Sequence, residues 1–256
     1  MSRTVALTLA VLASWAALAS QIRAEPLDLG LPRELDPSKF ELFWFDDFDK
    51  FDLSADGFGR HKWFNGLWYS KPAPLDLFSH SDGILRLATR ANKGALISTL
   101  SPKVGGHETA FSYGYFEARL ALSANAANWP AFWLFSRDHA RGTDGNHWCE
   151  IDIFELFASK FAGTVHEWID FKNKQNRNNL VTLPQGTDLS QWHTYGMTWE
   201  PGKVTWYFDK KELMSAATPK ICDSQELFLI LNANTHDPAV EQFLSVDWIA
   251  VFRWKP

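Results

Sequence analysis

The chain has 256 residues, 46% of them apolar, which is enough to bury the core of one large domain. Its formal charge of −5 leaves no basic footprint and argues against a nucleic-acid partner. No internal repeat or low-complexity linker divides the sequence. We therefore expect one folded domain that works as a monomer.

The N-terminus has the pattern of a secretory signal peptide over residues 1–24. Arg3 supplies the positive charge, residues 4–19 are apolar, and small residues offer cleavage points near 19 or 24. The apolar segment is short for a membrane span, and a retained anchor is the alternative. We expect a secreted protein, extracellular or periplasmic, without membrane contact once the signal is removed.

Residues 25–41 combine prolines with mixed charge, which predicts an extended lead-in to a domain at 42–256. Short alternating or apolar runs separated by turns then follow, and no long amphipathic helix interrupts them. Many short strands with turns about every 8–12 residues predict an all-β fold, a β-sandwich or jelly roll. The main runs are 84–89, 96–100, 111–122, 129–135, 147–157, 163–169, 194–199, 204–208, 227–232 and 244–254.

The run at 147–157 places three carboxylates among apolar and aromatic residues. On a strand, Trp148, Glu150 and Asp152 share one face, and the residues between them face the core. Glu155 has the wrong parity for the acidic face. A β-bulge after Asp152 returns it to that face by absorbing one residue.

Across such a bulge, four strand steps place the two glutamate Cα atoms roughly 13 Å apart. Side chains that lean inward bring the carboxyls to about 5–6 Å, the separation that a retaining glycosidase uses. The alternatives are a solvated acidic face, or a helix in which Asp152 and Glu155 meet at i,i+3. Like charges raise one another's pKa, which suits a pair with one acid and one base.

Two cysteines in an exported chain permit one disulfide. Cys149 falls on the face of the acidic strand opposite Glu150, which suggests a buried core thiol. We therefore expect no bridge between Cys149 and Cys222.

Several segments together resemble glycoside hydrolase family 16. The motif EIDIFE at 150–155 resembles the E-x-D-x-x-E signature of that family. The resemblance runs from about Phe43 to the end, with similar segments in the same order. They are YGYFEARL at 113–120, WPAFWLF at 129–135, WHTYGMTWEPGKVTWYFDKKEL at 192–213 and VDWIAVF at 246–252.

The resemblance implies a concanavalin A-like jelly roll with a substrate cleft across its concave sheet. Glu150 is then the nucleophile, Glu155 the acid/base, and Asp152 lies between them and tunes the pair. The extra residue between Asp152 and Glu155 resembles the bulged branch of laminarinases, agarases, carrageenases and porphyranases. Leu96 stands where laminarinases often carry arginine, a departure that argues against laminarin as the substrate.

The resemblance also implies roles for residues outside the motif. An aromatic wall, loop residues on the glycone side and a histidine within the acidic cluster are expected to contact or position the sugars. These substrate-binding candidates are Asn65, Trp68, Trp129, Trp133, Trp148, His166 and Trp168. For Trp148 and His166, a purely structural place in the core is the alternative.

Asp247 resembles a position that binds calcium on the convex side of some family members, and a plain surface aspartate is the alternative. One carboxylate is a weak signal, because calcium takes six to eight oxygen ligands. We expect no required cofactor, a possible structural calcium at most, and a polysaccharide as the partner.

The expected function is that of a secreted, retaining endo-β-glycosidase that hydrolyses a β-linked glucan or galactan by double displacement. A transglycosylase would use the same residues with a sugar acceptor in place of water. A non-catalytic carbohydrate-binding jelly roll is the rival from another class, but a pure binder has no need for Glu150, Asp152 and Glu155 together.

Overall fold

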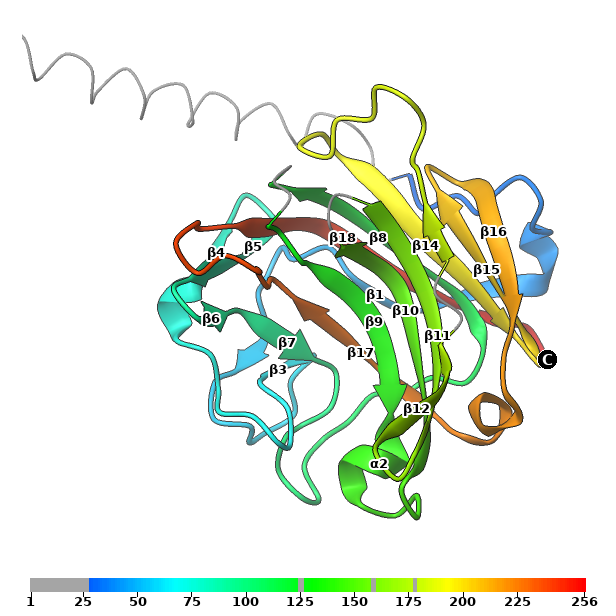
Figure 1. The fold of residues 1–256 in the computed structure, drawn as a ribbon, viewed down its shortest axis with the longest axis horizontal. Coiled ribbons are helices and arrows are strands. Elements are labelled where there is room, and N and C mark those ends of the chain that lie inside the picture. Colours follow the sequence, from blue (N-terminus) through cyan, green and yellow to red (C-terminus); the bar gives the residue numbers. More distant parts are fainter. Residues whose placement is uncertain (1–27, 124–126, 158–159, 177–178) are drawn as a thin grey trace, which may run out of the picture.

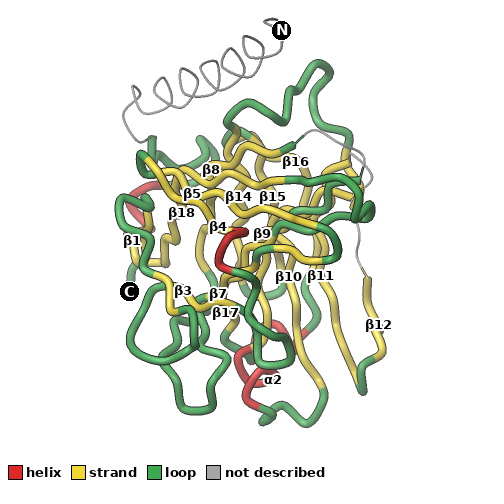
Figure 2. The backbone as a smooth tube through the Cα atoms, turned by 90° about the vertical axis from the view of Figure 1, so that its left-hand side faces the viewer, coloured by secondary structure: helices red, strands yellow, loops and turns green. Residues whose placement is uncertain are grey.

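The computed structural model describes residues 28–123, 127–157, 160–176 and 179–256, and the expected signal peptide lies outside these ranges. Two sheets pack face to face, so the predicted all-β sandwich is confirmed (Figure 1). Seen from the side, β1 and the C-terminus lie at one flank and β10–β12 at the other (Figure 2). No helix in the described ranges is long and apolar enough to cross a membrane.

We call the layer that faces the viewer in Figure 1 the front sheet. Within the described residues it has nine strands in the order β12–β11–β10–β9–β17–β7–β3–β2, with β13 paired to β11. Their bounds are β2 (Leu53–Ser54), β3 (Trp63–Asn65), β7 (Leu96–Ser98), β9 (Ala131–Ser136), β10 (His147–Phe157), β11 (Lys160–Ile169), β12 (Lys172–Asn176), β13 (Asn179–Val181) and β17 (Leu227–Asn232).

The back sheet also has nine strands in the described ranges, in the order β16–β15–β14–β8–β18–β5–β4. Strand β1 pairs with β18, and β6 pairs with β5. Their bounds are β1 (Phe40–Asp46), β4 (Phe78–Ser81), β5 (Ile84–Arg90), β6 (Lys93–Gly94), β8 (Gly114–Leu122), β14 (His193–Glu200), β15 (Lys203–Phe208), β16 (Lys211–Ala217) and β18 (Phe243–Trp254).

Helical segments are short and lie at the ends of strands. They are the 3₁₀ turns η1 (Pro37–Lys39), η2 (Leu75–Leu77) and η3 (Lys220–Ser224) and the helix α2 (Arg137–Arg141). Ser136 caps α2, because its hydroxyl accepts a hydrogen bond from the backbone N–H of His139. Gly142 ends the helix with a φ of 71°, a conformation that glycine adopts without strain.

The main core fills the space between the sheets. Ile151 from β10 belongs to it together with Met197 and Trp206 from the back sheet, and all three are fully buried. Successive side chains on a strand point to opposite faces, so every second residue of these strands points away from the core. The outward face of β10 is therefore free to carry polar groups.

The lead-in covers part of the outer face of the back sheet. Leu29, Leu31 and Leu35 pack against a second buried cluster that includes Tyr115 and Trp248. This cover explains why β8 is buried on both faces despite its alternating sequence. The first strand begins at Phe40, so the domain starts slightly before the predicted boundary at 42.

Cys149 and Cys222 form a disulfide, with their Cα atoms 5.0 Å apart. The prediction of a free buried thiol is therefore wrong, although Cys149 does face the core as its parity indicated. The partner arrives on η3, and Gln225 just beyond this turn bonds to the backbone of β10 at Cys149 and His147. The two cysteines are 73 residues apart in the sequence, and no local pattern indicates that Cys222 lies next to Cys149.

Candidate active site

The acidic strand β10 contains the expected bulge. Its pairing with β11 joins Asp152 to Thr164 and next joins Glu155 to Ala162, so two residues of β10 lie opposite one residue of β11. The extra residue places Ile153 and Phe154 side by side in the core, where both are fully buried. The predicted bulge is confirmed, and it returns Glu155 to the face of Glu150 and Asp152.

A tryptophan from the back sheet holds the bulge. Trp206 of β15 donates its indole N–H to the backbone carbonyl of Asp152 at 2.8 Å, in a fully buried contact. Gly163 lies opposite the bulge on β11, and a Cβ there would come within 2.6 Å of the Trp206 indole. The bulge therefore needs an indole donor on one sheet and a glycine on the other.

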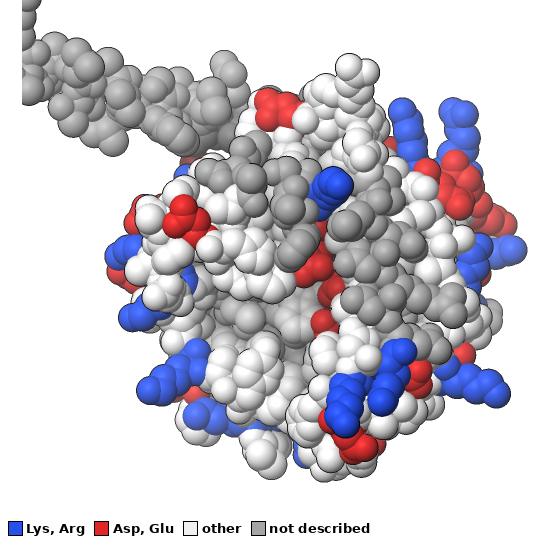
Figure 3. All heavy atoms as spheres, in the orientation of Figure 1, with Lys and Arg blue, Asp and Glu red and all other residues white. Residues whose placement is uncertain are grey.

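The three carboxylates line a cavity of about 370 Å³ on the outer face of the front sheet. Acidic side chains form a row along the hollow in this face in Figure 3. Aromatic and amide side chains line the rest of the cavity together with residues 94–96, Ala131 and Ala233. The larger residues of this lining are Tyr69, Leu96, Trp129, Trp133, Asn232 and Asn234.

Each carboxylate of the row has its own hydrogen-bond donor. Trp168 donates to Glu150 at 3.0 Å, and Trp129 donates to Glu155 at 2.6 Å. The Nε2 atom of His166 lies 3.1 Å from Asp152 and 4.0 Å from Glu150. The indole donors are neutral, so they orient the glutamates without adding a charge.

Burial sets the protonation of the pair. Burial, followed by the charge of Asp152, raises the pKa of Glu150 to about 8, although His166 and the hydrogen bond from Trp168 act in the opposite direction. Burial, followed by the charge of Asp152, also raises the pKa of Glu155. Without substrate, the coupled pair of glutamates therefore tends to keep a proton. The two glutamates are distinguished by their places on the strand, one before and one after the bulge.

His166 responds to the same charges. Burial alone would lower its pKa, but the hydrogen bond with Asp152 and the charges of the three carboxylates raise the pKa overall. Its second nitrogen, Nδ1, lies 2.6 Å from Nδ2 of Asn173 on β12, which donates to the neutral ring, and the protonated ring needs the amide turned so that its oxygen accepts. An imidazolium here stabilises the ionised form of Glu150.

One group in the described residues brings three ligand atoms close enough for a metal ion. Glu150, Asp152 and His166 have such atoms within 4.8 Å of one another. These atoms already take part in the hydrogen bonds and charge contacts of the row, so we assign no metal to them.

The match to known proteins agrees with this geometry. The family model of the glycosyl hydrolases family 16 matches residues 72–223, more than half of the chain. The chain belongs to glycoside hydrolase family 16. The matched segment includes the whole acidic strand and Cys222, and it ends one residue before the end of the turn η3.

Relatives within family 16 are distant. An endo-1,3-1,4-β-glycanase of Rhizobium meliloti is 27% identical over 184 residues, which are 69% of this chain and 38% of the relative. A β-glucanase of Bacillus subtilis is 28% identical over 186 residues, 70% of this chain and 69% of the relative. The chain thus spans well under half of the R. meliloti enzyme's length.

Solved structures agree on the fold. The catalytic domain of a laminarinase from Thermotoga maritima superposes with a TM-score of 0.69 at 19% identity, over 85% of this chain and 100% of that domain. The predicted jelly-roll sandwich is therefore the fold of this family 16 member.

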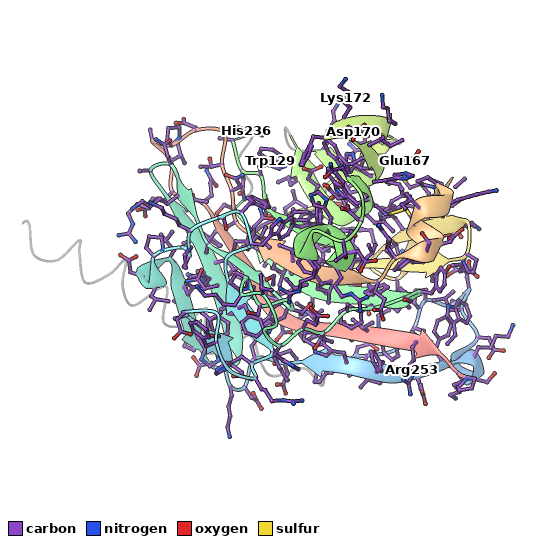
Figure 4. The ribbon with its side chains drawn as sticks, turned by 90° about the horizontal axis from the view of Figure 1, so that it is seen from below. Trp129, Glu167, Asp170, Lys172, His236 and Arg253 are labelled. Carbon is purple, nitrogen blue, oxygen red and sulfur yellow. A yellow bond between two sulfur atoms is a disulfide. The ribbon has the colours of Figure 1, made fainter. Side chains whose placement is uncertain are left out.

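Four of the predicted binding residues of this family 16 chain lie at the cavity. Trp129 and Trp133 line it directly, and Trp133 donates to Asn232 at 2.8 Å. His166 and Trp168 hold the carboxylates from the side of β11. Trp129 also stacks on His236, with ring centroids 4.6 Å apart (Figure 4).

Trp148 lies on the predicted face but only 4% of it is exposed, because other rings cover it. It stacks on His139 at 3.6 Å and on Trp168 at 5.8 Å. The alternative of a structural ring thus describes Trp148 better than direct contact with sugar. Its role is to support Trp168, which in turn contacts Glu150.

The loop after β3 differs from the expectation. Asn65 is only 1% exposed, and its amide group both donates to and accepts from the backbone of Ala73. It therefore closes the loop and has no side-chain atom left for a sugar. Trp68 packs on Phe135 at 5.1 Å, whereas the next residue, Tyr69, lines the cavity.

Tyr69 was not predicted, although it directly follows Trp68 in an aromatic run. Burial, and then the charge of Glu150, raises the pKa of its hydroxyl. The cavity residues Asn232 and Asn234 and the histidine partner Asn173 were also missed, because amides in strands and loops carry no distinctive pattern.

Asp247 does not fit a calcium site. Its carboxylate accepts a hydrogen bond from Arg119 at 2.5 Å, and the guanidinium charge next to it disfavours a cation. The side chain is nearly buried on β18 rather than exposed on the surface. We therefore assign to Asp247 an ion pair with Arg119 and no metal ion.

Because Trp206 holds the bulge, we expect Trp206→Phe to lower both the stability of the protein and its turnover. Loss of the donor leaves the buried carbonyl of Asp152 unsatisfied, which costs about 1–3 kcal/mol of unfolding free energy. Displacement of Glu155 by even about 1 Å lowers hydrolytic turnover by about a hundredfold. Urea unfolding and kcat measure the two effects.

The matched control is Trp199→Phe. Trp199 is also a fully buried tryptophan of the back sheet, but its indole N–H donates to none of the described residues. We expect this variant to lose stability from the smaller ring and to keep its turnover. Equal turnover in the two variants would contradict the role of Trp206.

The charge pattern predicts that His166→Asn raises the pKa of Glu150 above the wild-type value of about 8. The variant lacks the imidazolium that favours the ionised carboxylate of Glu150, so the titration midpoint of Glu150 rises by about one pH unit. Carbon-13 NMR of the glutamate carboxyl carbons measures it. His147→Asn, which changes a histidine paired with Glu167, is the control and leaves the midpoint unchanged.

Proposed function

We propose that this protein is a secreted, retaining, endo-acting β-glucanase. The observation that carries the proposal is the bulge in β10, which places Glu150, Asp152 and Glu155 on one face at the floor of a cavity. Family 16 membership and relatives named as β-glucanases support the same reaction class.

In the first step, a carboxylate oxygen of Glu150 attacks the anomeric carbon. Glu155 gives its proton to the glycosidic oxygen as the bond from that oxygen to the anomeric carbon breaks. A covalent glycosyl ester on Glu150 remains, and Glu155 is left ionised. Burial raises the pKa of Glu155 and so keeps the acid protonated, whereas His166 and the N–H of Trp168 favour the ionised form of Glu150 that attacks.

In the second step, Glu155 removes a proton from water. The water oxygen attacks the anomeric carbon and releases Glu150 as a carboxylate. Two inversions give a product with the original β configuration. The donors from Trp168 and Trp129 hold the two glutamates in place through both steps.

The substrate that we propose is a neutral β-glucan. One relative is named a β-glucanase and the other an endo-1,3-1,4-β-glycanase, and the cavity offers indole rings and amide groups for hydroxyl-rich sugar rings. Leu96 lines the cavity with an apolar side chain where laminarinases often carry arginine. We therefore favour a mixed-linkage glucan over laminarin.

Export is supported by two features. The first 24 residues have the pattern of a signal peptide, and the Cys149–Cys222 disulfide fits an oxidising compartment. We propose an extracellular or periplasmic location, a monomer, and a reaction that needs no cofactor, because carboxylates perform every proton transfer.

The acid/base role of Glu155 predicts chemical rescue. Glu155→Ala hydrolyses barley mixed-linkage glucan poorly, by a factor of about 10²–10⁴, because the leaving oxygen is no longer protonated. On a 4-nitrophenyl glycoside, which leaves without a proton, the loss is smaller. Added azide then restores turnover and yields a glycosyl azide, detected by mass spectrometry.

Glu150→Gln is the matched control, because it cannot form the covalent intermediate: an azide product from it could arise only by direct displacement and would have the α configuration, whereas Glu155→Ala gives the β-azide. Its turnover stays lost on both substrates. A β-azide from Glu150→Gln in place of Glu155→Ala would exchange the two assignments. No rescue in either variant would argue against double displacement.

Net retention follows from the order of carboxylates on the strand. An inverting enzyme holds a water between carboxyls about 6.5–9.5 Å apart, whereas a retaining one sets them about 5–5.5 Å apart. Asp152 lies between Glu150 and Glu155 on their face and occupies the room for such a water. Proton NMR before mutarotation should show the β-anomer first, and an initial α-anomer signal would contradict the nucleophile role of Glu150.

A further inference from the structure

The turn between β11 and β12 contains an unexpected aromatic residue. Asp170 and Phe171 form this turn, with φ angles of 50° and 61°. Two-residue hairpin turns with positive φ at both positions favour asparagine, aspartate or glycine. Aspartate suits the first position, but a bulky aromatic side chain at the second is a strained choice. Local backbone preference therefore does not explain Phe171.

Burial does not explain it either. The side chain of Phe171 is 67% exposed. It makes edge-to-face contacts with Trp148 at 5.3 Å and with His139 at 5.8 Å, which leave most of the ring open. A strained position combined with an exposed ring indicates a role outside the fold.

Two series of ring contacts connect Phe171 to the catalytic cavity. On one side, Trp148 stacks on Trp168 at 5.8 Å, and Trp168 bonds to Glu150. On the other side, His139 contacts Trp68 at 5.9 Å, which contacts Tyr69 at 4.8 Å. Packed rings, with Trp148 nearly buried among them, therefore connect Phe171 to Trp168 and to Tyr69 at the cavity.

Tyr69 lines the cavity and is 68% exposed. Figure 4 places Asp170 and Lys172, the neighbours of Phe171, on the same side of the molecule as Trp129 and His236. Arg253 lies on the opposite side. The turn therefore rises beside the cleft, beyond Glu150 and away from Glu155.

We propose that Phe171 forms a distal sugar-binding subsite at the Glu150 end of the cleft. The inference rests on the proposed function and extends it. The open ring offers an apolar face to the C–H groups of a pyranose, and Tyr69 adds an aromatic face and a hydroxyl. Asp170 and Lys172 flank the ring with opposite charges, so a neutral β-glucan unit is the ligand that fits.

The position predicts which substrates use the subsite. Phe171 is separated from Trp168 by the ring of Trp148, so a short oligosaccharide bound at the carboxylates does not reach it. Longer chains pass beyond Glu150 and gain the contact with the exposed ring of Phe171. Phe171 should therefore act on the dependence of kcat/KM on chain length.

The test compares Phe171→Gly with wild type on β-glucan oligosaccharides from the disaccharide to the octasaccharide, each with a 4-nitrophenyl leaving group. Glycine accepts the positive φ, so the melting temperature should stay the same or rise. The loss in kcat/KM should grow with chain length and reach about tenfold for the longest, chiefly through KM. Phe171→Trp should restore most of the loss.

Phe43→Ala is the matched control. Phe43 is also partly exposed, but it lies under Arg253, on the side opposite the cleft. This variant should show the wild-type dependence on chain length.

Three results would contradict the subsite. One is a loss in Phe171→Gly that is equal at every length and accompanied by a lower melting temperature, because Phe171 would then only cap Trp148. The second is an unchanged length dependence in Phe171→Gly. The third is a wild-type protein that cleaves none of these oligosaccharides or barley glucan, which would contradict the proposed function together with the subsite.

Discussion

The site depends on one buried hydrogen bond, between the indole N–H of Trp206 and the backbone carbonyl of Asp152. A bulge removes a carbonyl from regular strand pairing, and a buried carbonyl without a donor costs about 1–3 kcal/mol. The back sheet supplies that donor, and Gly163 leaves the room for it. Without this contact, regular pairing would turn Glu155 into the core, where an unpaired carboxylate is far more costly. The two sheets therefore determine the active site jointly.

The charges on the outer face of β10 also depend on well-placed donors. Three carboxylates in one row repel one another, and burial strengthens the repulsion. His166 is the one cationic group that the described residues place in hydrogen-bonding contact with the row, through Asp152. The two glutamates instead receive neutral indole donors. This arrangement keeps a proton available on the pair, whereas a lysine or arginine in contact with either glutamate would remove it.

Much of the fold and the centre of the site could be predicted from the sequence, because both follow from strand parity. The alternation at Glu150 and Asp152 defines a face, and the mismatch at Glu155 requires a bulge. Contacts between distant segments could not be predicted in this way. Cys222 arrives on a turn whose approach to β10 depends on the back sheet, and the amides of Asn65 and Asn173 find partners that no local pattern specifies.

The aromatic residues show why composition alone misleads about contact with substrate. Trp148 and Trp206 are buried and serve the site indirectly, one by stacking under Trp168 and the other by holding the bulge. Trp129 combines both kinds of role, since it lines the cavity and donates to Glu155. A row of buried charges needs rigid donors at fixed positions, and an indole between packed rings has little freedom to move. The rings beneath the cleft therefore fix the geometry of the carboxylates, and the exposed rings at its edges are the ones that we propose bind the polysaccharide.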